Sequence, residues 1–122
     1  MAVDRDSLLR SDDDDGEPAR IFVRVESGFY QGLEWPLARA STVIGRGRTA
    51  DLVLSEATIS RAHALLGFKG EKPFVQDLGS TNGTLLNDVR EAQAALKHGD
   101  ELRMGRLLLR IVVVGLGDAD VH

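Results

Sequence analysis

The 122-residue chain contains no cysteine and only three histidines. The missing cysteines exclude a disulfide framework, a thiolate zinc site and a cysteine nucleophile. The histidines, which are His63, His98 and His122, are too few and too dispersed to indicate a histidine-rich metal site. We therefore expect neither a bound metal nor a cofactor.

Long hydrophobic runs are also missing from the sequence. The longest apolar stretch, 107–114, is interrupted by Arg110 and is far shorter than the roughly 20 residues that cross a bilayer as a helix. The first residues include Asp4, Arg5 and Asp6 and lack the apolar stretch of a secretory signal. These features predict a cytoplasmic protein without membrane insertion.

The formal charge of −4 is unevenly distributed along the chain. Residues 1–19 hold seven acidic and two basic side chains, residues 116–122 hold two acidic ones, and residues 20–115 hold 13 basic and 10 acidic ones. Acid-rich segments with few large apolar residues do not form a packed core. We therefore predict a disordered acidic N-terminal segment at 1–19, one folded domain at 20–115 and a flexible C-terminal tail at 116–122.

Apolar residues within 20–115 follow the period of β-strands. Ile21, Val23 and Val25 alternate with their neighbours, and short apolar runs recur every 8–12 residues with glycine, proline, asparagine or aspartate between them. The segment 90–97 is compatible either with a weak helix or with a loop and a short strand. The pattern predicts an all-β domain, either a sandwich or a barrel. The expected strands are 21–26, 33–37, 42–44, 52–54, 63–68, 74–78, 84–86, 101–104 and 107–114.

A glycine-rich hexapeptide, Gly45–Ala50, directly follows one expected strand. It has the spacing of a dinucleotide-binding fingerprint, but that motif requires a helix to begin there. The residues that follow predict a strand and a loop instead. The hexapeptide is therefore a loop that exposes Arg46 and Arg48, either to solvent or to a ligand.

The segment Ser60–His63 places a hydroxyl, a guanidinium and an imidazole close together. It lacks the glycines of a nucleophile elbow, and we see no activated nucleophile or paired acid and base in the chain. We therefore do not expect an enzyme. His63 begins an apolar strand, which favours a structural imidazole that fixes the neighbouring loop.

The segment Asp77–Thr84 combines hydroxyl and amide side chains with two glycines in a strand-turn-strand pattern. Asn82-Gly83 alone would suffice for a simple hairpin. Ser80 and Thr81 add hydrogen-bond donors at the tip of the loop, where binding residues tend to lie. Together, the three loops offer guanidiniums, hydroxyls and amides, which are the groups that bind a phosphate dianion.

The order and spacing of these three motifs resemble the forkhead-associated (FHA) domain. The resemblance covers about residues 20–115, and the segment Leu96–Leu102 followed by Gly105 is similar to the closing segment of the family. It implies a β-sandwich of about eleven short strands in two sheets. It also implies a non-catalytic module whose loops at one end bind phosphothreonine peptides.

The resemblance also assigns expected roles to individual residues of this chain. Arg46 and Ser60 would contact the phosphate, Thr81 would add a hydroxyl or amide contact, and Arg61 would contribute near the phosphate or to the peptide. Asn82 would hold the backbone of the peptide. The expected supporting residues are Gly45, His63 and Gly83, and the possible specificity residues are Arg48 and Ser80. Gly47-Arg48 departs from the family pattern, in which serine often follows the Gly-Arg pair.

The resemblance implies a signalling adaptor downstream of Ser/Thr kinases. The expected partner is a phosphothreonine-containing protein or peptide, namely a Ser/Thr kinase or its substrate, and not a nucleic acid. The alternative is a phosphate-independent interaction scaffold with the same fold. The sequence does not indicate an oligomeric state.

Overall fold

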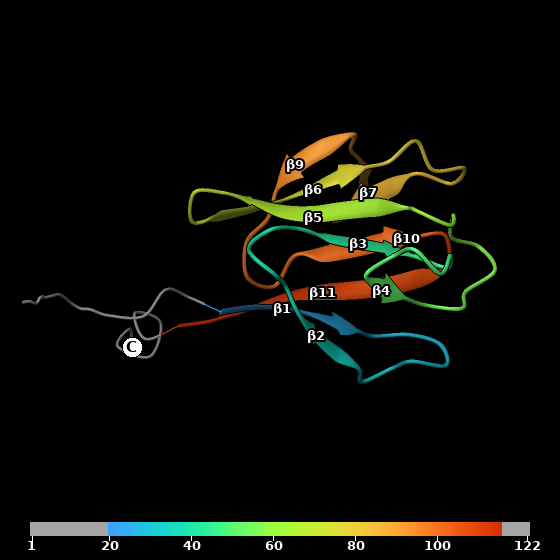
Figure 1. Cartoon of the computed structure of the whole chain (residues 1–122), viewed down its shortest axis with the longest axis horizontal. Coiled ribbons are helices and arrows are strands. Elements are labelled where there is room, and N and C mark those ends of the chain that lie inside the picture. The colour runs from blue at the N-terminus through green and yellow to red at the C-terminus, as the bar shows by residue number, and fades with distance from the viewer. Residues whose placement is uncertain (1–19, 116–122) are drawn as a thin grey trace, which may run out of the picture. The chain divides into compact units, whose positions relative to one another are not determined.

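The computed structural model describes residues 20–115, of which residues 21–112 form one compact unit. The predicted disordered segment 1–19 and the predicted flexible tail 116–122 lie outside the described residues. The described part is an all-β structure of eleven strands in two sheets (Figure 1). This confirms the predicted fold class. No helix that could cross a membrane occurs between residues 20 and 115.

One sheet has six strands in the order β2-β1-β11-β10-β7-β8, and the other has five in the order β4-β3-β5-β6-β9. The strands are β1 Arg20–Val25, β2 Glu34–Pro36, β3 Thr42–Gly45, β4 Leu52–Val53, β5 Ala64–Lys69, β6 Lys72–Asp77, β7 Thr84–Leu86, β8 Val89–Arg90, β9 Gln93–Ala95, β10 Glu101–Met104 and β11 Leu107–Val114.

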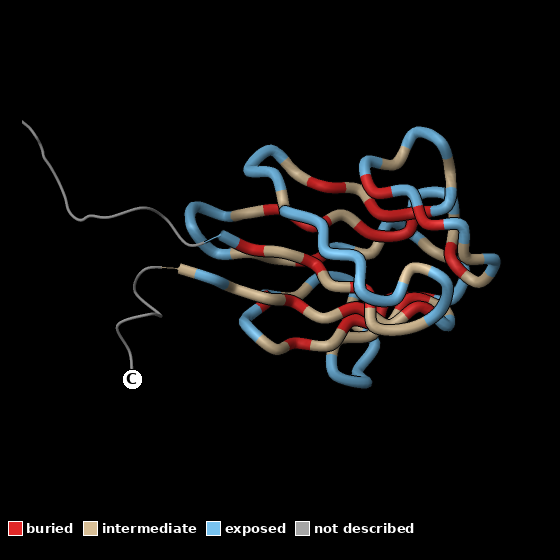
Figure 2. The backbone as a smooth tube through the Cα atoms, turned by 90° about the horizontal axis from the view of Figure 1, so that it is seen from below, coloured by how far each residue is buried: buried red, intermediate tan, exposed pale blue. Residues whose placement is uncertain are grey.

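The core is formed by alternate side chains of the strands. In β1 the residues Ile21, Val23 and Val25 are buried, as their alternation predicts, and β5, β10 and β11 contribute buried residues in the same way. Figure 2 shows short buried stretches interspersed with intermediate and exposed ones along the chain. Each such side chain contributes about 1.5–3 kcal/mol when it leaves water. Pro36 lies on β2 at a sheet edge, where its missing N–H breaks no ladder.

The segment 90–97 contains no helix. Val89–Arg90 forms β8 in one sheet and Gln93–Ala95 forms β9 in the other, so the alternative of a loop and a strand is confirmed and the helix is wrong. An isolated eight-residue helix is marginal in water, whereas β9 gains backbone partners along β6. The pairing of β9 with β6 therefore outweighs the helical propensity of the alanines in this segment.

The dipeptides Asn82-Gly83 and Asn87-Asp88, which lie between apolar runs, both have residue types that predict a tight turn, and their outcomes differ. Asn87 and Asp88 have φ of 49° and 71° and join β7 to β8, as a two-residue hairpin requires. The predicted hairpin at Asn82-Gly83 is wrong, because β6 and β7 belong to different sheets. Asn82 lacks the positive φ of such a turn, so the segment crosses from one sheet to the other.

Candidate functional site

Three connecting segments lie at one end of the sandwich, at the right of Figure 1. We call them the first loop (46–51, after β3), the second loop (54–63, between β4 and β5) and the third loop (78–83, between β6 and β7). Arg46 N donates to Ser60 O at 3.1 Å and Thr81 N donates to Ser60 Oγ at 3.1 Å. The structure therefore brings together predicted residues from all three loops.

Gly45 permits the close contact between the first and second loops. A Cβ at this position would overlap the carbonyl oxygen of Arg61, a backbone atom that cannot turn aside. Gly47 is also close, and its N–H donates to Arg61 O at 3.1 Å. The glycines therefore allow the two backbones to bond directly, which places Arg46 beside Ser60.

The guanidinium of Arg46 is held at one nitrogen and open at the others. Its Nε donates to Ile59 O at 2.7 Å, which fixes the plane of the group against the second loop. Among residues 20–115 its two terminal nitrogens have no hydrogen-bond or ion-pair partner, and the residue is exposed. The fork is thus oriented in advance for an anion.

His63 is completely buried and joins the second loop to the third. Its Nδ1 accepts from Ser60 N at 3.0 Å, so its Nε2 carries the proton and donates to Gly83 O at 2.8 Å. This requires the neutral ring with its hydrogen on Nε2. The imidazole satisfies two backbone groups at once and sets the position of Ser60.

Asp77 organises the third loop from inside. Its carboxylate accepts from Ser80 Oγ at 2.6 Å, from Ser80 N and Gly79 N at 3.0 Å, and from Thr84 Oγ1 at 2.8 Å. Burial works to raise the pKa of Asp77, but the hydrogen bonds from Ser80 and Thr84 outweigh it and lower the pKa below its usual range. Sequence reasoning gave Asp77 no role, although an aspartate three residues before a serine is a turn signal.

The hydroxyl of Ser80, a predicted specificity residue, makes hydrogen bonds at the third loop. Its hydroxyl donates to Asp77 and accepts from Gly83 N at 2.9 Å. Gly83 itself has φ of 80°, a conformation that glycine adopts at little cost. The hydroxyl of Ser80 therefore shapes the third loop.

Thr58 connects the second loop to the third loop and to the turn between β10 and β11. Sequence reasoning gave it no role. Its carbonyl oxygen accepts from Asn82 Nδ2 at 2.7 Å. Its hydroxyl donates to Glu56 Oε2 at 2.7 Å and accepts from Arg106 N at 2.8 Å. Asn82 is thereby held by one amide hydrogen, while its side-chain oxygen has no partner among residues 20–115.

Beside these residues the surface has a hollow of about 380 Å³ that we call the arginine hollow. Its lining consists of Arg46, Gly47, Arg48, Thr49 and Arg61. Among residues 20–115, no acidic residue belongs to it. The structure thus brings Arg48 and Arg61, predicted from separate motifs, to the same place.

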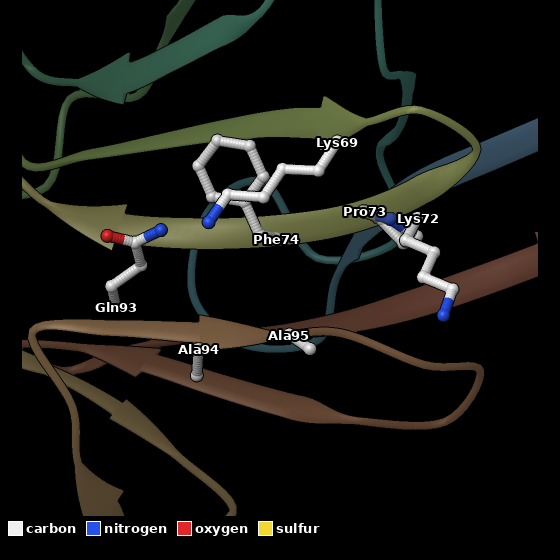
Figure 3. Close-up of a pocket in the computed structure, with 7 residues that line it drawn as sticks. All are labelled: Lys69, Lys72, Pro73, Phe74, Gln93, Ala94 and Ala95. Atoms are coloured by element: carbon white, nitrogen blue, oxygen red, sulfur yellow. The ribbon is translucent and has the colours of Figure 1, made fainter.

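A second hollow of about 380 Å³ lies between β6 and β9 (Figure 3). Phe74 forms its floor with Lys69 above the ring, 5.2 Å from the centroid. None of the predicted site residues lines it. No cluster of histidine, aspartate or glutamate able to hold a metal occurs in the described part of the chain.

A family model described as FHA domain matches residues 42–105, which include all three loops. The oxoglutarate dehydrogenase inhibitor of Corynebacterium jeikeium is 34% identical over 85 residues, covering 70% of this chain and 59% of that protein. The glycogen accumulation regulator GarA of Mycobacterium tuberculosis is 34% identical over 92 residues, covering 75% and 57%. The chain therefore spans less than two thirds of the length of these relatives.

Solved structures share the same fold. A chain from a study of phosphothreonine-dependent FHA domain interactions superposes with a TM-score of 0.71 at 29% identity, covering 76% of this chain and 95% of that one. The FHA domain of FhaA, in complex with the intracellular domain of Rv3910, gives a TM-score of 0.69 at 30% identity, covering 75% and 98%.

Proposed function

Because this chain belongs to the FHA family of binding modules, we propose that it reads phosphothreonine in partner proteins and acts as an adaptor downstream of Ser/Thr kinases. The observation that carries the proposal is the meeting of Arg46, Ser60 and Thr81 through hydrogen bonds between three loops. The partner would be a phosphorylated kinase or a substrate of one.

The chemistry of the three loops suits a phosphate dianion. Phosphothreonine carries about −1.5 to −2 charges at pH 7 and three acceptor oxygens. The free terminal nitrogens of Arg46 match two of these oxygens in a bidentate contact, and the hydroxyls of Ser60 and Thr81 supply further donors. Asn82 would bond the peptide backbone through its free amide oxygen and second amide hydrogen. Arg61 would lie near the phosphate.

The similar proteins support a role in regulation. GarA is described as a glycogen accumulation regulator, the corynebacterial relative as an oxoglutarate dehydrogenase inhibitor, and FhaA binds the intracellular domain of Rv3910. These descriptions concern the regulation of a process, the inhibition of an enzyme and the binding of another protein. We infer the same class of role for this chain and leave the partner to experiment.

The proposal is tested with the substitution Arg46→Ala in the full chain. We expect affinity for a phosphothreonine peptide library to fall by about 1.5–3 kcal/mol, at least tenfold, because a charge-assisted contact is removed. Isothermal titration measures the affinity, and urea unfolding verifies that the variant is folded. Lys72→Ala, which removes one charge at the β5–β6 turn, is the matched control and keeps the affinity.

The same titration is repeated with unphosphorylated peptides. Binding that is equal with and without phosphate, or equal in Arg46→Ala and the parent, would contradict the proposal. Equal binding would favour the phosphate-independent scaffold.

A further inference from the structure

The arginine hollow offers more positive charge than one phosphothreonine uses. Arg46, Arg48 and Arg61 all line it, whereas Ser60, Thr81 and Asn82 do not. The hollow therefore includes Arg46 but not the residues that join the second loop to the third. A phosphate bound by Arg46 and Ser60 would leave the part of the hollow beside Arg48 and Arg61 unfilled.

The other two guanidiniums are uncommitted. Among residues 20–115, the side chains of Arg48 and Arg61 have no hydrogen-bond or ion-pair partner, and both residues are exposed. Arg39, Arg24 and Arg110 each have a carboxylate partner on the same domain. Within residues 20–115, Arg48 and Arg61 therefore place two uncompensated positive charges beside Arg46 in one hollow.

The backbone of the first loop adds neutral donors at the same place. The N–H groups of Arg48 and Thr49 and the hydroxyl of Thr49 make no hydrogen bond within the described part of the chain, while Ala50 N closes the turn on Gly47 O at 3.1 Å. Unpaired N–H groups in a turn favour an anion. The nearest acid in sequence, Asp51, accepts from Val43 N at 2.8 Å and does not line the hollow.

We propose that the arginine hollow binds a second anionic group of the same ligand, supplied by a residue within about three positions of the phosphothreonine. A carboxylate and a second phosphate share the required chemistry, since guanidinium binds both in bidentate fashion. An extended chain advances about 3.3 Å per residue, so neighbouring residues reach an adjacent subsite. This inference rests on the proposed function and specifies its ligand class.

The test compares three series of peptides at 0.15 M salt, a value of about physiological ionic strength. All contain one phosphothreonine between neutral residues; the second series adds glutamate, and the third adds another phosphothreonine, at each position in turn. We expect about a tenfold gain in affinity at one or two positions, larger for phosphate than for carboxylate. A gain in both series identifies either anion as a ligand, and a gain with phosphate alone identifies a doubly phosphorylated ligand.

The variant Arg48→Gln assigns the gain to the hollow. We expect it to lose most of the gain. The control Lys72→Gln removes the same charge at the start of β6 and keeps the gain, because the turn between β5 and β6 lies at the opposite end of the sandwich (Figure 1). No gain at any position, or an equal gain in Arg48→Gln and the parent, overturns this inference while the singly phosphorylated peptide still binds. Failure of that peptide to bind overturns the proposed function instead.

Discussion

Gly45 shows how one missing side chain controls the site. The carbonyl oxygen of Arg61 occupies the space that any Cβ at Gly45 would need, and the N–H groups of Arg46 and Gly47 bond the second loop directly beside it. His63 provides the complementary case, because its buried ring satisfies Ser60 N and Gly83 O together. The position of Ser60 is therefore fixed in two ways. The backbone of the second loop packs directly against Gly45, and the ring of His63 holds Ser60 N and Gly83 O.

We predict that Gly45→Ala lowers both stability and phosphopeptide affinity. The added methyl group must push the backbone of the second loop away, at a cost of about 1–3 kcal/mol in the free energy of unfolding. Urea unfolding and peptide titration measure the two effects.

The control for this substitution is Gly70→Ala at the β5–β6 turn. Gly70 has φ of 65° and open space around it, so the change costs about 1 kcal/mol of backbone strain without touching the loops. Unchanged phosphopeptide affinity in Gly45→Ala would show that the loop contact does not set the site.

The second loop holds the other loops in place. Its residue Thr58 connects it to the third loop and to the turn between β10 and β11. The hydroxyl of Thr58 joins Glu56 to Arg106 N, at the turn between β10 and β11, and its carbonyl oxygen holds Asn82. Residues distant in sequence are thus linked through one side chain and one backbone group. The arrangement of the loops depends on this link as well as on the strands.

We predict that Thr58→Val weakens the connection while Thr58→Ser preserves it. Valine has the shape of threonine without the hydroxyl, so Arg106 N and Glu56 each lose a partner, at a cost of about 1–3 kcal/mol. Amide hydrogen exchange at Arg106 should become faster in Thr58→Val and remain near that of the parent in Thr58→Ser. Equal exchange in the two variants would remove Thr58 from this role.

At the scale of the whole domain, the buried carboxylate of Asp100 and the half-buried carboxylate of Asp77 connect stability to pH. Asp100 accepts from Asn87 Nδ2 at 3.0 Å and Lys97 N at 2.8 Å, and Asp77 accepts from the third loop. Burial works to raise the pKa of Asp100, but the hydrogen bonds from Asn87 and Lys97 lower it below its usual range, as Ser80 and Thr84 do for Asp77. Both groups therefore favour the folded state when they are ionised.

We predict that the domain loses stability in acid. Because the pKa of each aspartate is lower in the folded than in the unfolded chain, their contribution is complete above the unfolded value of about 3.9 and is lost as pH falls through the folded value. Urea unfolding between pH 7 and pH 2.5 measures the loss. The variant Asp100→Asn should lose less free energy of unfolding than the parent below pH 4. A pH dependence identical to that of the parent would contradict the role given to Asp100.

Much of the fold follows from local sequence, because period-two alternation directly reports which side of a strand faces the core. This is why β1 and β11 were predicted with nearly the observed bounds, and why the turn at Asn87-Asp88 was identified from its residue types. The sequence left the structure open, or predicted it wrongly, where pairing between strands decides. The segment 90–97 became strands because β6 and β7 lie beside it, and Asn82-Gly83 connects two sheets because β7 pairs with β10.

The sequence by itself determined the all-β class, the family and the candidate residues for binding a phosphate, since residue types and spacing carry this information locally. Only the tertiary structure decided which donors are free. It engages Ser80 with Asp77 and one amide hydrogen of Asn82 with Thr58. It also leaves the ends of Arg46, Arg48 and Arg61 without a partner from residues 20–115 around one hollow. The physical reason is that hydrogen bonds between loops depend on how the strands place the loops in space, which no local pattern encodes.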